Sequence, residues 1–124
     1  MRLLLDSHVV LWWLNGSLGP VADEALASAD TTAVSVVTPW ELGLKQALGK
    51  LTIPPVWRQL LVADGFEFLP ITESHVDIAV SLPLHHRDPF DRMLIAQAKA
   101  EQLTLVTADR EFARYDVALL DPRI

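Results

Sequence analysis

Short apolar runs alternate with longer amphipathic stretches along all 124 residues of the chain. The first apolar run, residues 3–5, is too short for a helix and stops at Asp6, which predicts a buried strand. Residues 7–14 are almost wholly apolar, can be capped by Asp6 or Ser7, and end at an Asn-Gly pair. This second stretch is therefore expected to form a short helix.

The same two patterns recur to the end of the chain. Apolar or aromatic runs predict further strands at residues 33–37, 66–71, 104–107 and 117–120. Amphipathic stretches that open with capping residues or proline predict helices at residues 20–29, 38–49, 54–63, 88–102 and 109–114, and one from Thr72 or Ser74 to near Pro83. Because strands and helices alternate, we expect an α/β fold with a parallel sheet covered on both faces, in a single domain spanning residues 1–124.

Composition limits the location and the chemistry. Hydrophobic residues make up 51% of the chain and mean hydropathy is +0.27, so a large core or an interface must bury them. The chain has no cysteine, which excludes thiolate metal sites and fits a reducing compartment. Asp6 and His8 interrupt the first apolar run, and no stretch reaches the roughly 20 apolar residues of a membrane span. We therefore expect a cytoplasmic protein that is neither exported nor membrane-bound.

Four acidic residues lie at what should be one edge of the predicted sheet. Asp6 and Asp109 come directly after two of the strands. Glu41 and Asp91 lie in the first turns of two helices, one that follows the second strand and one that leads to the fourth. In an open parallel sheet, functional groups gather outside the carboxyl ends of the strands. The four carboxylates are therefore expected to be close in space.

Each of these acids also has a structural explanation when taken alone. Asp6 and Asp109 could be ordinary helix caps. Glu41 could complete a capping box with Thr38 and pair with Lys45 one turn later. Together, however, four carboxylates repel one another, and their ionised state is costly without a cation. We therefore expect a site for Mg²⁺ or Mn²⁺ that orients a water and hydrolyses a phosphodiester.

Asp88 and Asp91 open the longest predicted helix. Asp88 fits the N-cap and Pro89 the first helical position, so helix-start chemistry alone could explain both acids. Periodicity separates them, because Asp91 shares the helix face of Ile95, which must pack inward, while Arg92 lies on the outward face. We predict that Asp91 is the metal ligand, and that Asp88 starts the helix and could also reach the ion.

Four short motifs carry the candidate acids in order along the chain. They are LLDSH at residues 4–8, WE at 40–41, DPFDRMLIAQA at 88–98 and LVTADREF at 105–112. In this order they resemble the PIN-domain ribonucleases, and within that family the VapC-like toxins of prokaryotic toxin–antitoxin pairs. Many family members place the third acid three residues before an Ile-Ala pair, where this chain has Arg92. Asp91 lies four residues before that pair, so the choice between Asp88 and Asp91 stays open.

The resemblance implies a PIN-like three-layer α/β/α sandwich and a Mg²⁺- or Mn²⁺-dependent endoribonuclease that leaves a 5′-phosphate and a 3′-hydroxyl. The implied acidic cluster is Asp6, Glu41, Asp91 and Asp109, with Asp6, Asp91 and Asp109 as metal ligands and Asp88 and Glu41 as further candidates. Ser7 and Thr107 could hydrogen-bond a ligand carboxylate or water, or could be ordinary caps. The resemblance also implies an RNA substrate and a homodimer that a small antitoxin protein silences.

The net charge of −6 is opposite to that of a protein held to nucleic acid by general electrostatics. Four basic residues near the predicted site could contact RNA phosphates or could be solvated partners of neighbouring acids: Lys45, Arg87, Arg92 and Arg110. His85 and His86 are interpreted as residues of a solvated loop, because neither has a second histidine at metal-ligand spacing. A substrate contact of this pair stays open.

Two other classes of function are consistent with an acidic cluster. One is a non-catalytic regulatory module that binds a metal ion or phosphate, and the other is a metal-dependent DNA nuclease. A receiver-type module would need a paired acid near the first strand and a lysine after a late strand, and the sequence has neither. Comparing RNA with DNA cleavage separates the two nuclease hypotheses.

Overall fold

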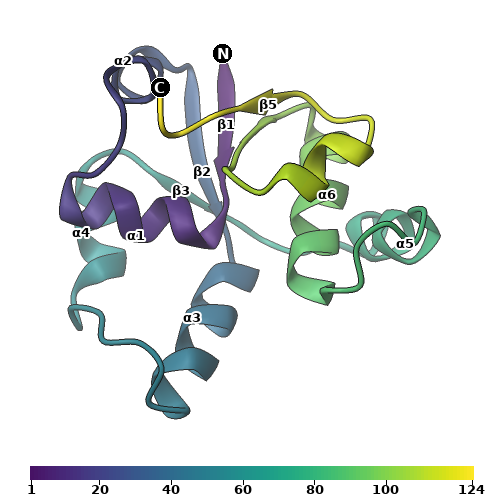
Figure 1. Ribbon diagram of the computed structural model, residues 1–124, viewed down its shortest axis with the longest axis horizontal. Coiled ribbons are helices and arrows are strands. Elements are labelled where there is room, and N and C mark those ends of the chain that lie inside the picture. The colour runs from purple at the N-terminus through teal and green to yellow at the C-terminus, as the bar shows by residue number, and fades with distance from the viewer.

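The structure, a computed structural model, describes residues 1–124 and contains one sheet of five parallel strands (Figure 1). The strands are β1 (Arg2–Leu5), β2 (Thr31–Ser35), β3 (Glu67–Leu69), β4 (Thr104–Val106) and β5 (Leu119–Leu120). The helices are α1 (Ser7–Asn15), α2 (Pro20–Ser28), α3 (Val37–Ala47), α4 (Trp57–Ala63), α5 (Glu73–Ser81), α6 (Pro89–Glu101) and the 3-10 helix η1 (Arg110–Arg114). This confirms the predicted order of elements. None of the helices has the length and apolar character needed to cross a membrane.

β1 lies at the centre of the sheet and separates two apolar clusters. Because successive side chains of a strand point to opposite faces, Leu3 and Leu5 pack in one cluster and Leu4 packs in the other. Helices α1, α2 and α4 contribute to the first cluster, and α5, α6 and η1 contribute to the second. Figure 1 shows α1 and α4 on one side of β1 and α5 and α6 on the other. The predicted α/β/α sandwich is therefore confirmed.

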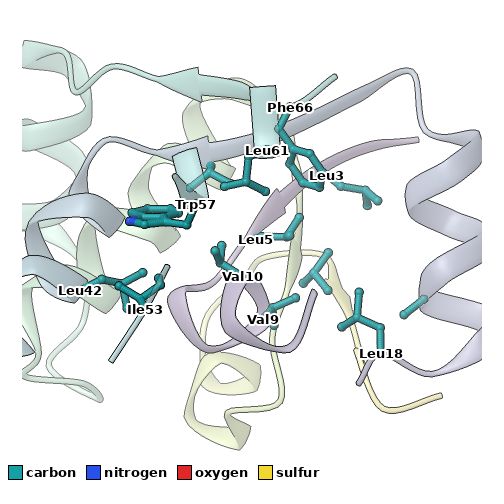
Figure 2. Packing of buried hydrophobic residues seen from close by; sticks show 13 residues of the cluster. Leu3, Leu5, Val9, Val10, Leu18, Leu42, Ile53, Trp57, Leu61 and Phe66 are labelled. Atoms are coloured by element: carbon teal, nitrogen blue, oxygen red, sulfur yellow. The ribbon is translucent and has the colours of Figure 1, made fainter. Parts of the chain in front are cut away.

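The first cluster fixes α1 against the sheet (Figure 2). Val9 and Val10 of α1 are fully buried and lie close to Leu5 of β1. Trp57 and Leu61 of α4 are buried in the same cluster. Burial of each such side chain contributes about 1.5–3 kcal/mol, so the position of α1 is strongly determined. As a result, the turn between β1 and α1, which carries Asp6, is held rigidly at the edge of the sheet.

The strand order β3-β2-β1-β4-β5 reverses direction at β1. The chain adds β2 and β3 on one side of β1 and then crosses to add β4 and β5 on the other side. The backbone N–H of Asp6 donates to the Val106 carbonyl at 3.1 Å, joining the ends of β1 and β4. A reversal of this kind opens a crevice outside the carboxyl ends of the central strands, where ligands of open α/β sheets bind.

The start of α3 differs from the prediction. The helix begins at Val37, whose N–H donates to Ser35 Oγ at 3.1 Å, so Thr38 lies inside its first turn. The predicted capping box of Thr38 with Glu41 is therefore wrong. The hydroxyl at the start of the helix belongs to Ser35, because β2 ends at Ser35 instead of continuing to residue 37 and the helix begins one residue earlier than expected.

The start of α4 also differs. α4 begins at Trp57 rather than at Pro54. The residue before a proline is disfavoured from helical conformation, and Pro55 follows Pro54 directly. The Trp57 N–H donates to the Pro54 carbonyl at 3.1 Å, in a turn that precedes the helix. The two prolines therefore delay the helix instead of opening it.

Candidate metal-binding active site

Five acidic side chains line one cavity of about 370 Å³ at the switch point of the sheet. They are Asp6, Glu41, Asp88, Asp91 and Asp109. They come from the end of β1, from α3, from the start of α6 and from the start of η1. The rest of the lining is His8, Leu44, Lys45, Leu48, Lys50 and Phe90. The structure thus brings together every acid that the sequence nominated as a ligand.

Asp6 is surrounded by hydrogen-bond donors that favour its charged form. It caps α1, where its Oδ1 accepts from the His8 N–H at 2.8 Å, and its Oδ2 accepts from Thr107 Oγ1 at 2.6 Å. Burial is the largest influence and raises the pKa of Asp6, but the hydrogen bonds from His8 and Thr107 together outweigh it and lower the pKa below 3.8. The hydrogen bond with Asp6 in turn raises the pKa of His8. Asp6 is therefore a fixed anion at neutral pH.

Glu41 is buried in α3, and each of its carboxylate oxygens has a partner. Its Oε1 accepts from Ser7 Oγ at 2.7 Å. Its Oε2 lies 3.2 Å from Lys45 Nζ, in the pair that their spacing along the helix predicted. Ser7 Oγ also lies 3.4 Å from Thr38 Oγ1. Ser7 and Thr107 thus each donate a hydroxyl hydrogen to one of the acids.

Asp88 and Asp91 differ in how the protein accommodates their charge. Asp88 is the N-cap of α6, as predicted, and its Oδ1 accepts from the N–H groups of Phe90 at 2.9 Å and Asp91 at 3.4 Å. Burial, together with the charges of Asp88 and Asp6, raises the pKa of Asp91 to about 7. Asp91 is therefore the acid whose charge is least compensated, and a bound cation would restore its ionised form.

His86 approaches two of the acids from the loop between α5 and α6. Its Nε2 lies 3.0 Å from Asp91 Oδ2 and 3.4 Å from Asp109 Oδ2, and its side chain is 17% exposed. Asp109 caps η1 with its other oxygen, which accepts from the Glu111 N–H at 2.9 Å. His85 is exposed as predicted, whereas His86 lies in the predicted loop but is only partly exposed and faces two acids. Histidine spacing does not reveal the position of His86, because its partners are carboxylates that lie farther along the sequence.

Lysines, and no arginines, line the cavity. Lys45 is one of the predicted RNA contacts, whereas Lys50 is not among them. Arg87 and Arg110 are exposed and lie outside the lining. The Arg92 guanidinium donates to the backbone carbonyls of Ala79, Leu82, Pro83 and His86 at 2.7–3.1 Å. These four bonds use both terminal nitrogens of Arg92 and hold the end of α5 and the following loop, so the structure gives this guanidinium a structural role.

The donor set fits a divalent cation. Carboxylate oxygens are the ligands that Mg²⁺ and Mn²⁺ take in proteins, and the cavity offers five such groups. One ligand atom from each of His86, Asp91 and Asp109 lies within 4.8 Å of the other two, close enough for a single ion to contact all three. The residues present therefore suit Mg²⁺ or Mn²⁺, and His86 adds one nitrogen donor to the carboxylate oxygens.

The fold and the site define a small α/β protein with an acidic cluster at a switch point of its sheet. The PIN domain family model matches residues 3–118. The chain therefore belongs to the PIN-domain family, which confirms the resemblance carried by its four motifs. Among curated proteins it is 38% identical over 114 residues to Ribonuclease VapC22 of Mycobacterium tuberculosis (strain ATCC 25618 / H37Rv), and the match covers 87% of each chain.

Several solved structures share the fold. VapBC2 from Rickettsia felis, solved bound to a DNA fragment from the VapBC2 promoter, has a TM-score of 0.73 at 19% identity over 97% of this chain and 98% of that chain. FitAcB from Neisseria gonorrhoeae has a TM-score of 0.70 at 22% identity over 98% of both chains. DNA-bound VapBC from Salmonella typhimurium has a TM-score of 0.70 at 19% identity over 98% of both chains. At these identities the likeness establishes the fold alone.

Proposed function

We propose that this chain is an endoribonuclease that depends on Mg²⁺ or Mn²⁺, and that it is the toxin of a toxin–antitoxin pair. The observation that carries the proposal is the convergence of Asp6, Glu41, Asp91 and Asp109 in one cavity, where burial and the neighbouring acids raise the pKa of Asp91 to about 7. Metal-assisted hydrolysis of a phosphodiester is the reaction that such a cluster serves. The similarity to a protein named Ribonuclease VapC22 supports RNA as the substrate.

Within this proposal, the ion is held by Asp6, Asp91 and Asp109, with Glu41 and Asp88 beside them. When bound, the ion supplies an activated water and offsets the negative charge that develops on the phosphate. Asp6 enters the reaction already ionised, because Thr107 and the backbone of the next turn donate to it. Asp91 gives up its proton as the ion binds, so that metal affinity includes the release of this proton.

Glu41 and two lysines would position the water and the RNA. Ser7 fixes one oxygen of Glu41, and the other oxygen faces Lys45 on the cavity wall, where it can accept a hydrogen bond from the attacking water. Lys45 and Lys50 can contact phosphates on either side of the scissile bond. Arg110, which is exposed and lies outside the cavity lining, remains a candidate for contact with an RNA phosphate. Because the net charge is −6, RNA binding should be weak and sensitive to salt.

A cleavage assay tests the proposed activity. Purified protein with Mg²⁺ or Mn²⁺ should cut a total RNA pool and leave 5′-phosphate and 3′-hydroxyl ends, and chelation or Asp6→Asn should abolish cutting. Asp77→Asn, which changes an exposed acid of α5, is the matched control and should cut like wild type. Cleavage that survives Asp6→Asn would contradict the proposal. Preferential cutting of single-stranded DNA would indicate a DNA nuclease, and ion binding without any cutting would indicate a regulatory module.

The toxin assignment includes a small antitoxin protein as partner, a homodimer as assembly and the cytoplasm as compartment. Fold relatives named as VapBC complexes support the antitoxin partner. Expression of the chain alone should arrest growth, Asp6→Asn should not, and co-expression of a short neighbouring reading frame should restore growth. Light scattering should give twice the chain mass of 13.8 kDa. Normal growth with active, soluble nuclease present would contradict the toxin role.

A further inference from the structure

We propose that His86 is a nitrogen ligand of the divalent cation that Asp91 and Asp109 hold, which makes the site a mixed oxygen and nitrogen centre. The inference rests on the proposed function only in requiring that a divalent cation occupies the acidic cluster. Its geometric basis is the position of His86 Nε2, 3.0 Å from Asp91 Oδ2 and 3.4 Å from Asp109 Oδ2. A cation placed among these three atoms would contact all of them.

The imidazole of His86 is aimed at the acids by contacts outside the cluster. Tyr115 Oη accepts from the His86 N–H at 2.7 Å and donates to the Pro83 carbonyl at 2.9 Å. Arg92 donates to the His86 carbonyl at 3.1 Å. The ring centroids of His86 and Phe112 lie 5.8 Å apart. Because both backbone polar groups are bonded and the ring has an aromatic neighbour, the side chain is preorganised toward the acids, as metal ligands usually are.

A second arrangement would produce the same contacts in the ion-free protein. A protonated His86 could bridge Asp91 and Asp109 as a cation and compete with a metal ion for their oxygens. The two arrangements predict opposite effects when the ring is removed. If His86 is a ligand, its loss weakens metal binding, and if it is a competing cation, its loss strengthens metal binding. We favour the ligand, because Asp91 and Asp109 approach the same ring nitrogen of His86, Nε2, within the reach of one ion.

A nitrogen ligand changes which ion the site prefers. Imidazole suits transition metals, whereas Mg²⁺ demands oxygen ligands and keeps several of its waters. Mn²⁺ accepts both kinds of donor, so His86 should strengthen Mn²⁺ binding much more than Mg²⁺ binding. The ratio of the two affinities therefore reports on the role of His86 independently of RNA cleavage.

The direct test is electron spin-echo envelope modulation of the full chain loaded with Mn²⁺, which detects a nitrogen bonded to the metal. Wild type should show this modulation and His86→Gln should lose it. His8→Gln and His85→Gln are matched controls, because His8 lines the same cavity and His85 is the exposed neighbour, and both should keep it. By calorimetry, His86→Gln should raise the Kd for Mn²⁺ about tenfold or more. The Kd for Mg²⁺ should change much less.

Tyr115→Phe tests the positioning of the ring without touching the cluster. It removes the hydroxyl that holds the loop and keeps the aromatic ring, so the nitrogen modulation should weaken while Mg²⁺ affinity stays close to that of wild type. Circular dichroism verifies that each variant is folded.

Modulation that persists in His86→Gln, or Mn²⁺ binding that is unchanged or tighter, would overturn the inference. Cleavage that requires Asp6, combined with a Mn²⁺ spectrum free of nitrogen modulation in wild type, would overturn it and leave the proposed function standing. A wild-type protein that neither binds Mn²⁺ nor cuts RNA would overturn both.

Discussion

Thr107 Oγ1 donates to Asp6 Oδ2 at 2.6 Å, and this hydrogen bond links two residues that are 101 positions apart in the sequence. Both side chains are buried, at the adjoining ends of β1 and β4. The bond stabilises the edge of the sheet and also lowers the pKa of Asp6 against the effect of burial. One contact therefore serves both the stability of the fold and the charge of the site.

Thr107→Val is expected to lower the free energy of unfolding by about 2 kcal/mol, because it removes a buried hydrogen bond to a charged group. The valine keeps the shape of the side chain, and Thr107→Ser keeps the hydroxyl as the matched control. Urea denaturation of both variants measures the difference. Equal stability of the valine and serine variants would contradict a role for the hydroxyl. Titration of Asp6 by NMR should show a higher pKa in the valine variant only.

The sequence pattern was sufficient to predict the order of elements and the convergence of the acids. Leu3, Leu4 and Leu5 form a run that only a central strand can bury on both faces, and the capping preference of aspartate places Asp88 at a helix start. Once parallel strands alternate with helices, their carboxyl ends lie at one edge, and the acids that follow them converge. These inferences depend on local periodicity and on one topological rule.

The roles of His86 and Arg92 could not be predicted in the same way. Each depends on the path of the loop between α5 and α6, which no periodicity specifies. Arg92 is outward-facing on a helical projection, but the end of α5 and the loop after it fold over the side chain and supply four carbonyl acceptors. His86 then reaches Asp91 because that loop is held in place. Hydrophobic periodicity predicts helices and strands, but it does not predict long-range contacts made by irregular backbone such as this loop.

Substituting Asp88 and Asp91 separately is expected to give different results, although they are only three positions apart. Asp91→Asn should abolish cleavage and weaken Mn²⁺ binding, because it removes the acid whose charge most requires a cation. Asp88→Asn keeps a good N-cap, so stability should change by less than about 0.5 kcal/mol and cleavage should fall only in part. Calorimetry and cleavage rates test both. Loss of Mn²⁺ binding in Asp88→Asn alone would mean that the two roles are reversed.

The stability of the metal-free protein is expected to fall as the pH rises toward 8. The pKa of Asp91 is raised from 3.8 to about 7 in the folded protein. Between pH 3.8 and about 7, the folded state keeps a proton on Asp91 that the unfolded chain has lost, so the free energy of unfolding declines as the pH rises through this range. The raised pKa of His8 acts in the same direction, since its contribution is present below 6.5 and is lost as the pH rises through the folded value.

Urea denaturation in EDTA at about pH 5.5 and about pH 8 measures this dependence. Wild type should be less stable at the higher pH, and Asp91→Asn should remove most of the difference. Excess Mn²⁺ at the higher pH should restore stability to wild type but not to Asp91→Asn, because binding to the folded state requires the carboxylate. A wild-type protein that is equally stable at both values without metal would refute the assignment of a proton to Asp91.

Arg92→Lys is expected to destabilise the protein while keeping its charge. The guanidinium donates through two nitrogens to four carbonyl oxygens, and one ammonium group cannot reproduce this planar geometry. The free energy of unfolding should fall by about 2 kcal/mol, because carbonyls at the end of α5 and in the loop, three of them in partly buried contacts, lose a charged donor. Since the same contacts hold the His86 loop, Mn²⁺ affinity should fall as well.

Lys50→Ala is the matched comparison for Arg92→Lys, because Lys50 is an exposed residue of the cavity wall. This change should leave stability within about 0.5 kcal/mol of wild type. It should weaken binding to single-stranded RNA and reduce the slope of log K against log salt by about 0.7, the value for one phosphate contact. For these binding measurements both variants carry Asp6→Asn, so that the RNA stays intact. If Arg92 contacted phosphate, Arg92→Lys would keep both stability and RNA affinity, which is the opposite of the pattern expected from its four carbonyl partners.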